Sequence, residues 1–268
     1  MSSISVGGVG AIQAGNHVEK SQKVLQDAFR KLASSLSINQ ASDDAARLAI
    51  AERFNTEVQG VNQATMNTND GVAVTQIAES GLKQIQEGQH RLRELAVQSS
   101  NGSLNDSDRK AIQAEATQIQ ENIASIVADT NYNGQNLLTS NDKISLQTGP
   151  DAGDQTGIKL TDFTNAFTTV DLSTQSGAQQ AITSLTEDSS KVSSARAELG
   201  AAESGLNRTI AQLSGLSEAL SASGSRIQDA DIAKETSILA SASIRANAGI
   251  AIQAQANLST SRVHQLVQ

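Results

Sequence analysis

The sequence predicts a mainly α-helical protein built from long antiparallel helices, with one small β-hairpin region at about residues 140–165. Apolar residues recur at helical spacing through both ends of the chain, whereas strict alternation occurs only in the middle. Aromatic residues make up 2% of the 268 residues, and Pro150 is the single proline. Because large aromatic side chains usually fill a thick core, this composition favours thin layers of helix packed on helix.

The first predicted helix carries one apolar stripe. Its members are separated by three, four or seven residues, which keeps them on one helix face. They are Val18, Leu25, Phe29, Leu32 and Leu36. The stretch 37–41 interrupts the pattern, so the helix is expected to end near Leu36.

A second helix is predicted to begin at Ser42 and to run to about Ser99. Ser42 is a favourable N-cap residue. Asp43 and Asp44 would lie in the first turn, where carboxylates complement the helix dipole. Such a helix would be roughly 85 Å long at 1.5 Å per residue. A compact domain rarely contains a helix of that length.

A third helix is predicted after the Asn101-Gly102 break. Asn105 precedes Asp108 by three residues, a spacing that resembles a capping signal. The helix is expected to continue to about Ala128.

The middle of the chain predicts the only β structure. Asn133-Gly134 marks a turn. Residues 144–146 and 158–160 alternate with period two on either side of a turn region at 149–151, which suggests a hairpin.

The C-terminal third contains a seven-residue repeat of apolar residues, which predicts a long helix packed at a shallow angle on another long helix. The repeat is Leu185, Val192, Leu199, Leu206, Leu213, Leu220 and Ile227. Most seam positions between these residues are polar, so a helical bundle is favoured over a free two-stranded coiled coil. The N-terminal helices are the expected partners.

After Ile227 the chain continues as an alanine-rich helix with a weak apolar stripe. Ordering one residue costs about 1–2 kcal/mol of backbone entropy, so neither end of the chain is expected to fold firmly alone. Neighbouring copies are expected to stabilise both ends. The predicted polymerisation stripes contain Leu25, Phe29, Leu32, Leu36, Ile227, Ile238 and Ile252.

Composition excludes several classes of function. The formal net charge of −8 disfavours nucleic acid or an anionic membrane as the main partner. There are no cysteines, so disulfides and thiol chemistry are excluded. No apolar run is long enough to span a bilayer, and residues 1–15 show no ordinary secretory signal. A chain of this kind would need a dedicated export route to leave the cell.

No catalytic, cofactor or metal site is predicted. The three histidines, His17, His90 and His264, occur in unrelated segments without carboxylates at ligand spacing. The His-Glu-x-x-His pattern is absent. Solvated surface histidines are therefore the favoured interpretation.

Several motifs, in the same order along the chain, resemble those of bacterial flagellins. They are Leu36–Ala46, Ala64–Gly71, Arg91–Gln98, Tyr132-Asn133-Gly134, Ser225–Glu235 and Ala254–Asn257. The motifs are long, and they are distributed over nearly the whole chain. The resemblance is to a short flagellin that lacks the variable outer domains.

The resemblance implies a filament subunit used for swimming motility, with two domains that each contain both chain ends. An inner coiled-coil domain would comprise 1–43 with 229–268, and an outer helical-bundle domain would comprise 44–228. It also implies an extracellular location, reached through the flagellum's own secretion channel without a cleaved signal peptide. The implied partners are further copies of the chain, the flagellar cap, junction proteins and an export chaperone.

The resemblance further places Arg91, Leu95 and Glu115 at positions that the vertebrate innate receptor for flagellin recognises. The alternative interpretation is a charged helix face on which Arg91 and Glu115 form local ion pairs. Both interpretations can hold in a shed monomer. His90 stands where the family often has Gln.

Four glycines, Gly200, Gly205, Gly215 and Gly224, weaken the predicted C-terminal helix. Close packing against a neighbouring helix is the preferred explanation, since glycine permits close approach whether or not anything moves. The alternative is that they let the helix bend when a filament changes shape.

Two other functions remain as alternatives. A flagellin-like junction protein between hook and filament shares parts of both chain ends, although the match at Arg91–Gln98 favours flagellin. A cytoplasmic coiled-coil signalling module would need a central hairpin tip and a membrane segment, and neither is visible in the sequence.

Overall fold

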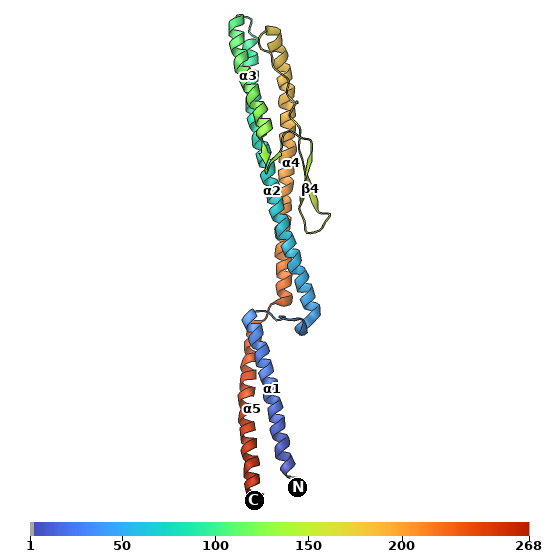
Figure 1. Ribbon diagram of the computed structural model, residues 1–268, viewed down its shortest axis with the longest axis vertical. Coiled ribbons are helices and arrows are strands. Elements are labelled where there is room, and N and C mark those ends of the chain that lie inside the picture. Colours follow the sequence, from blue (N-terminus) through green and yellow to red (C-terminus); the bar gives the residue numbers. More distant parts are fainter. Residues whose placement is uncertain (1–2, 268) are drawn as a thin grey trace. The chain divides into compact units, whose positions relative to one another are not determined.

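The computed structural model describes the backbone of residues 3–267 and the side chains of residues 12–258. Within the described residues the fold is mainly α-helical, as predicted (Figure 1). The helices are α1 (Ser3–Ser34), α2 (Ala41–Ser99), α3 (Asp106–Asp129), α4 (Gln175–Gln228) and α5 (Ile232–Val267). The strands are β1 (Asn131–Tyr132), β2 (Gln135–Asn136), β3 (Lys143–Gln147) and β4 (Gln155–Lys159).

The chain divides into two compact units. The terminal unit comprises the described residues up to Thr56 together with those from Ala219 onward. The central unit comprises Glu57–Glu218. Each unit therefore combines segments from both halves of the sequence, and α2 and α4 contribute to both units.

In the terminal unit, α1 and α5 pack side by side as an antiparallel pair (Figure 1). Small side chains form their contact: Ala14, Ala28, Ala242 and Ala246 are buried. At Gly249 a Cβ atom would lie 2.6 Å from Cγ2 of Val18, so a larger residue there would push the helices apart. The two helices form a single thin layer, as predicted from the low content of aromatic residues.

A short backbone crossing connects the two halves of the terminal unit. The N–H of Ser37 donates to the carbonyl oxygen of Gln228 at 2.7 Å, and the N–H of Ala230 donates to the carbonyl oxygen of Ser35 at 2.9 Å. Ser35 has a φ of 60°, which turns the chain sharply out of α1. Ile38 is buried beside this crossing, although the sequence indicated only an interruption.

The predicted N-cap at Ser42 is wrong. Helical dihedrals fail at Asp44, whose φ of −164° and ψ of 99° are extended. Its Oδ1 accepts a hydrogen bond from the N–H of Arg47 at 3.0 Å, which is the geometry of an N-cap residue. The carboxylate of Asp43 instead accepts hydrogen bonds from the backbone N–H groups of Asn39 and Gln40. The long helix therefore begins after Asp44.

In the central unit, α2, α3 and α4 pack around one elongated hydrophobic core. Asn105 caps α3 as predicted, since its side chain accepts from the N–H of Asp108 at 2.9 Å. The seven-residue repeat is also confirmed. Its members from Leu185 to Leu213 are buried, and Leu220 and Ile227 are half-buried.

Side-chain contacts show that α4 runs antiparallel to α2. Arg196 pairs with Glu79, and Glu203 accepts from Gln76 at 2.9 Å. Further along α4, Ser217 contacts Asn62. As the residue number rises on α4 it falls on α2, so the predicted pairing with an N-terminal helix is confirmed.

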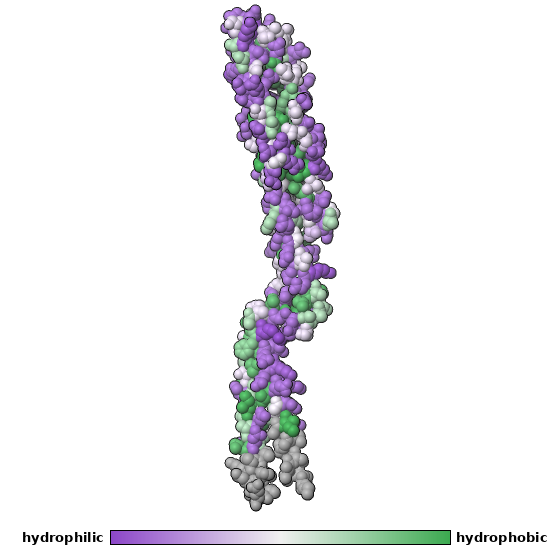
Figure 2. Space-filling view, viewed as in Figure 1, coloured by the Kyte–Doolittle hydropathy of each residue, from purple (hydrophilic) through white to green (hydrophobic). Residues whose placement is uncertain are grey.

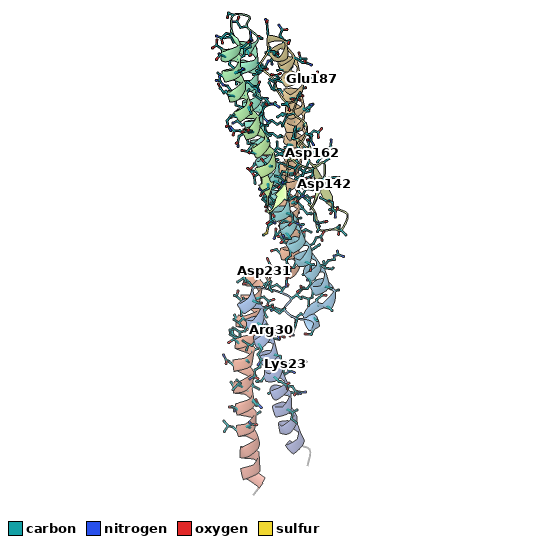
Figure 3. All side chains as sticks on the ribbon, turned by 45° about the horizontal axis from the view of Figure 1, so that its top comes forward. Lys23, Arg30, Asp142, Asp162, Glu187 and Asp231 are labelled. Atoms are coloured by element: carbon teal, nitrogen blue, oxygen red, sulfur yellow. The ribbon has the colours of Figure 1, made fainter. Side chains whose placement is uncertain are left out.

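The predicted hairpin is present, with Ile144 opposite Ile158 in an antiparallel β3–β4 pair. Asp142 and Asp162 lie together near its base (Figure 3), where the N–H of Leu160 donates to the carbonyl oxygen of Asp142. The prediction of a single β region is wrong, because β1 and β2 form a second, smaller pair. Its turn contains Asn133 and Gly134, both with positive φ, as a type I′ turn requires.

Close packing within the chain does not explain the four α4 glycines. A Cβ at Gly200 or Gly215 would meet nothing within 4 Å, and one at Gly224 would just touch Phe54. The glycines of α2 behave differently. At Gly81 a Cβ would lie 2.7 Å from Oγ1 of Thr130.

Candidate assembly surfaces and recognition cluster

The predicted stripe of α1 divides between a packed side and an exposed side. Leu25, Leu32 and Leu36 are half-buried. Phe29 is 58% exposed, although it is one of the few aromatic residues of the chain. Only part of this stripe is therefore covered within the chain.

The stripe near the C-terminus is divided in the same way. Ile227 and Ile238 are half-buried, whereas Ile252 is 61% exposed. Further exposed apolar residues of the terminal unit were not in the predicted stripes: Ile12, Val24, Ile50, Ile232 and Ile250. The sequence does contain a sign of the exposed residues on α5, because apolar residues occur on more than one face of this helix. That pattern is typical of a helix that is covered on all sides.

Exposed apolar side chains gather on the terminal unit more than on the central unit. Figure 2 shows apolar patches at the surface of the α1–α5 pair. A two-helix layer buries only the faces at its single seam, so the outward faces stay uncovered in one chain. Contiguous apolar surface on a soluble protein marks an interaction site. The outward faces of α1 and α5 are therefore candidate assembly surfaces.

Charged side chains interact where the C-terminal end of α1 meets the N-terminal end of α5. Lys31 of α1 reaches the largely buried Glu235 of α5, with 3.8 Å between Nζ and Oε1. Asp231 caps α5 by accepting from the N–H of Lys234. Figure 3 labels Asp231 there, with Arg30 and Lys23 on α1. These contacts therefore lie where α1 ends and α5 begins.

Among the described residues of the terminal unit, Asp43 has a perturbed pKa. The backbone N–H of Asn39 lowers the pKa of its carboxyl below the usual 3.8, with further lowering from Gln40 and from the charge of Arg30. Ionised Asp43 therefore stabilises the turn that leads from the crossing into α2.

Arg91 and Glu115 belong to the candidate recognition cluster (Arg91, Leu95 and Glu115), and they form the ion pair that the alternative interpretation expects. Nη2 of Arg91 lies 2.7 Å from Oε1 of Glu115, and Nη1 lies 2.9 Å from Oε2 of Glu94. The bonds to Glu115, then those to Glu94, raise the pKa of Arg91. Arg91 and Glu115 are half exposed, so this pair is open to a partner in the single chain.

Leu95 does not share that surface. It is 1% exposed and belongs to the hydrophobic core between α2, α3 and α4. His90 and His17 are exposed. The side chain of His264 lies outside the described residues.

The described residues contain neither a cluster of possible metal ligands nor a helix suited to span a membrane. Among them, no group of three or more His, Cys, Asp or Glu side chains could hold a metal ion. None of the helices in the described part of the chain has the length and apolarity needed to cross a bilayer.

The two ends of the chain match known protein families. The family model of the bacterial flagellin N-terminal helical region matches residues 9–143, and that of the C-terminal helical region matches residues 178–267. This chain belongs to the bacterial flagellin family. The N-terminal match contains α2 and α3, and the C-terminal match contains most of α4 and all of α5.

Relatives of similar length support the family assignment. A flagellin of Halalkalibacterium halodurans is 39% identical over 249 residues, which is 91% of this chain and 92% of the relative. A flagellar filament 31.3 kDa core protein of Treponema maltophilum is 33% identical, over 90% of this chain and 91% of the relative. The crystal structure of Bacillus cereus flagellin aligns with a TM-score of 0.52 at 26% identity and covers 55% of this chain and 88% of its own.

Proposed function

We propose that this chain is the structural subunit of a bacterial flagellar filament that serves swimming motility. The observation that carries the proposal is the uncovered apolar surface of α1 and α5, at the two chain ends that match the flagellin families. Relatives of similar length named as flagellin or filament core protein support it.

In this mechanism the subunit acts mechanically and not as an enzyme. Many copies bury the outward faces of α1 and α5 against one another, and each buried Å² of apolar surface contributes about 25 cal/mol. Weak contacts of this kind add along a helical polymer, because each subunit has several neighbours. The result is a stiff tube that a motor attached elsewhere can turn.

The domain boundaries proposed for the filament are 1–43 with 229–268 for the inner domain and 44–228 for the outer domain. The backbone crossing between Leu36 and Asp229 supports this division, because the two segments meet beside the proposed boundaries. The capping of α2 at Asp44 supports it further.

The proposed location is the extracellular flagellum, reached through the flagellar export channel. The proposed partners are further copies of this chain, the flagellar cap, junction proteins and an export chaperone. A chain without cysteine can be threaded through a channel without internal cross-links, which supports export in an unfolded state.

We also propose that the shed monomer is recognised by the vertebrate innate flagellin receptor through Arg91 and Glu115. The exposure of this ion pair supports direct contact. Leu95 would act by holding α2 in place beneath it, because its side chain is buried.

Electron microscopy of purified protein under polymerising conditions tests the filament proposal. The full chain is compared with a chain of residues 35–231, which lacks α1 and α5. Filaments are expected only from the full chain. Filaments formed by the shortened chain would contradict the proposed mechanism, provided that circular dichroism shows its remaining helices folded.

A further inference from the structure

A cavity of about 440 Å³ lies within the central unit, apart from the proposed assembly surfaces. Its walls come from α2, α3, the segment after β4 and the first half of α4. Leu92, Val127, Phe163, Phe167 and Leu185 make most of the interior apolar. Typical small-molecule sites have volumes of roughly 300–1,000 Å³ and apolar walls with a few polar groups, so the size and lining match such a site.

One buried amide lines this cavity without a partner. Gln89 of α2 is 3% exposed, and neither Oε1 nor Nε2 has a hydrogen-bond partner among the described residues. A buried polar group without a partner is costly, and a leucine could fill the position without that cost. The amide presents one acceptor and two donors, so its natural complement is a group that carries a donor and an acceptor side by side.

The charged side chains that line the cavity are carboxylates. The described lining residues include the carboxylates of Glu121 and Asp188 and no basic side chain. Asp188 is already engaged, because its Oδ2 accepts from the N–H of Thr168 at 2.9 Å and its Oδ1 pairs with Lys191. Because Lys191 compensates Asp188 and no described lining residue is basic, the lining offers a carboxylate no positive partner. This disfavours a carboxylic acid, which is ionised at neutral pH.

Two phenylalanines supply a flat apolar wall. The rings of Phe163 and Phe167 stack with their centroids 5.5 Å apart, and both line the cavity. Glu121, Ala124 and Thr164 line it as well and are exposed, so they mark its opening to solvent. A ligand would enter past these residues and place its apolar body against the rings.

We propose that this cavity is a binding site for a neutral small molecule with a primary amide or lactam on an apolar, preferably aromatic, body. The ligand's N–H and C=O pair with the side-chain amide of Gln89, and its apolar body contacts Phe163, Phe167 and Leu185. Its lining residues belong to the central unit and include neither Arg91 nor Glu115.

The probe is 3-phenylpropanamide, with 3-phenylpropanoate as the anionic analogue of the same shape. The full chain, kept monomeric and labelled with ¹⁵N-glutamine, is titrated and observed by NMR. The resonance of the Gln89 side-chain amide is assigned by its loss in Gln89→Leu. Ala124→Phe narrows the opening of the cavity, and Ala114→Phe is the matched control because Ala114 is exposed on α3 away from the cavity.

A saturable shift of the Gln89 amide resonance is expected with 3-phenylpropanamide. The propanoate and the Ala124→Phe variant should each bind at least about tenfold more weakly, whereas Ala114→Phe should bind like the parent chain. The melting temperature of the parent chain should rise with the amide, since a ligand that binds only the folded state stabilises it. Gln89→Leu should still fold, because leucine suits an apolar wall. It lacks the reporter resonance, so its binding is measured by the rise in melting temperature, which should correspond to at least about tenfold weaker binding of the amide.

Three results would overturn the proposal. The first is the absence of any saturable shift up to about 5 mM amide. The second is equal binding of amide and propanoate, which would mean that Gln89 is satisfied by water and selects nothing. The third is the same Gln89 shift on polymerisation without any amide, which would assign the cavity to a side chain of a second copy.

Discussion

The backbone N–H of Ser37 donates a hydrogen bond to the carbonyl oxygen of Gln228, with 2.7 Å between nitrogen and oxygen, although 191 residues separate them in sequence. The hydroxyl of Ser37 reaches the same oxygen at 3.2 Å. Together with the bond from Ala230 to Ser35, this contact joins the segment that leaves α1 to the segment that enters α5. We expect this crossing to make the two chain ends one cooperative unit.

Ser37→Pro should open this crossing. Proline removes the donor N–H and leaves the carbonyl of Gln228 without its backbone partner, which costs about 1–3 kcal/mol locally. Hydrogen exchange at the N–H of Ala230 should then become faster. Ser37→Ala keeps the N–H and serves as control. Unchanged exchange at Ala230 in the proline variant would mean that the crossing is not cooperative.

Asp44→Ala should weaken the start of α2 by about 1 kcal/mol, because the N–H of Arg47 loses its acceptor. Urea unfolding and exchange at Arg47 measure the effect. Asp44→Ser keeps a capping oxygen and should restore most of the loss. Ser42→Ala is the control variant and should change the unfolding free energy little. If it loses as much stability as Asp44→Ala, Ser42 is the N-cap residue, as the sequence predicted.

Acid should loosen the turn before α2. The pKa of Asp43 is lower in the folded chain than its usual 3.8, so its stabilisation is fully present above that value. It is lost as the pH falls through the lower, folded pKa, when the carboxyl gains a proton. Exchange at Asn39 and Gln40, corrected for the intrinsic rate, should rise in this range. In Asp43→Asn this pH dependence should disappear, and its persistence would point to another carboxylate.

Two glycine substitutions should change stability in opposite directions. Gly215→Ala should stabilise the chain by about 0.5–1 kcal/mol, because its Cβ meets open space and alanine favours the helix. Gly81→Ala should destabilise by about 1–3 kcal/mol, because Thr130 lies in the way and is fixed by its own bond to Ile126. Urea unfolding of both variants measures the difference. Equal effects would show that α2 and α3 can move apart freely.

Substitutions in the recognition cluster should separate contact from packing. Arg91→Ala and Glu115→Ala should reduce the response of reporter cells that carry the innate flagellin receptor, with little change in melting temperature, since an exposed ion pair contributes little to stability. Leu95→Ala should cost about 2–5 kcal/mol of unfolding free energy because it leaves a cavity in the core. Arg93→Ala, on the same helix and exposed, is the control. Full response from Arg91→Ala would remove the proposed contact.

Local features of the fold could be read from the sequence because their causes are local. The repeat from Leu185 to Leu213 places every seventh residue on one face, whatever that face packs against. Asn105 captures the N–H of Asp108 within its own turn. Asn133-Gly134 supports positive φ by itself, although the short β1–β2 pair around it was not expected.

The candidate surfaces were only partly predictable. Periodicity identifies which residues share a face, but it does not say whether that face is covered. Phe29 and Leu32 belong to one predicted stripe, yet Phe29 is exposed and Leu32 is half-buried. Leu95 was identified from a motif in the sequence, but its burial depends on the packing of α3 and α4 against α2.

By itself, therefore, the sequence determined the helices, the hairpin and the family resemblance, since these rest on spacing, capping and motif order along the chain. The tertiary structure alone decided that Asp44 caps α2, that Ser37 meets Gln228 and that Gln89 faces a cavity. The physical reason is that each of these features depends on the position of groups that are distant in sequence or on backbone dihedrals that the turn imposes. No local pattern encodes which carbonyl, ring or empty volume a side chain will finally meet.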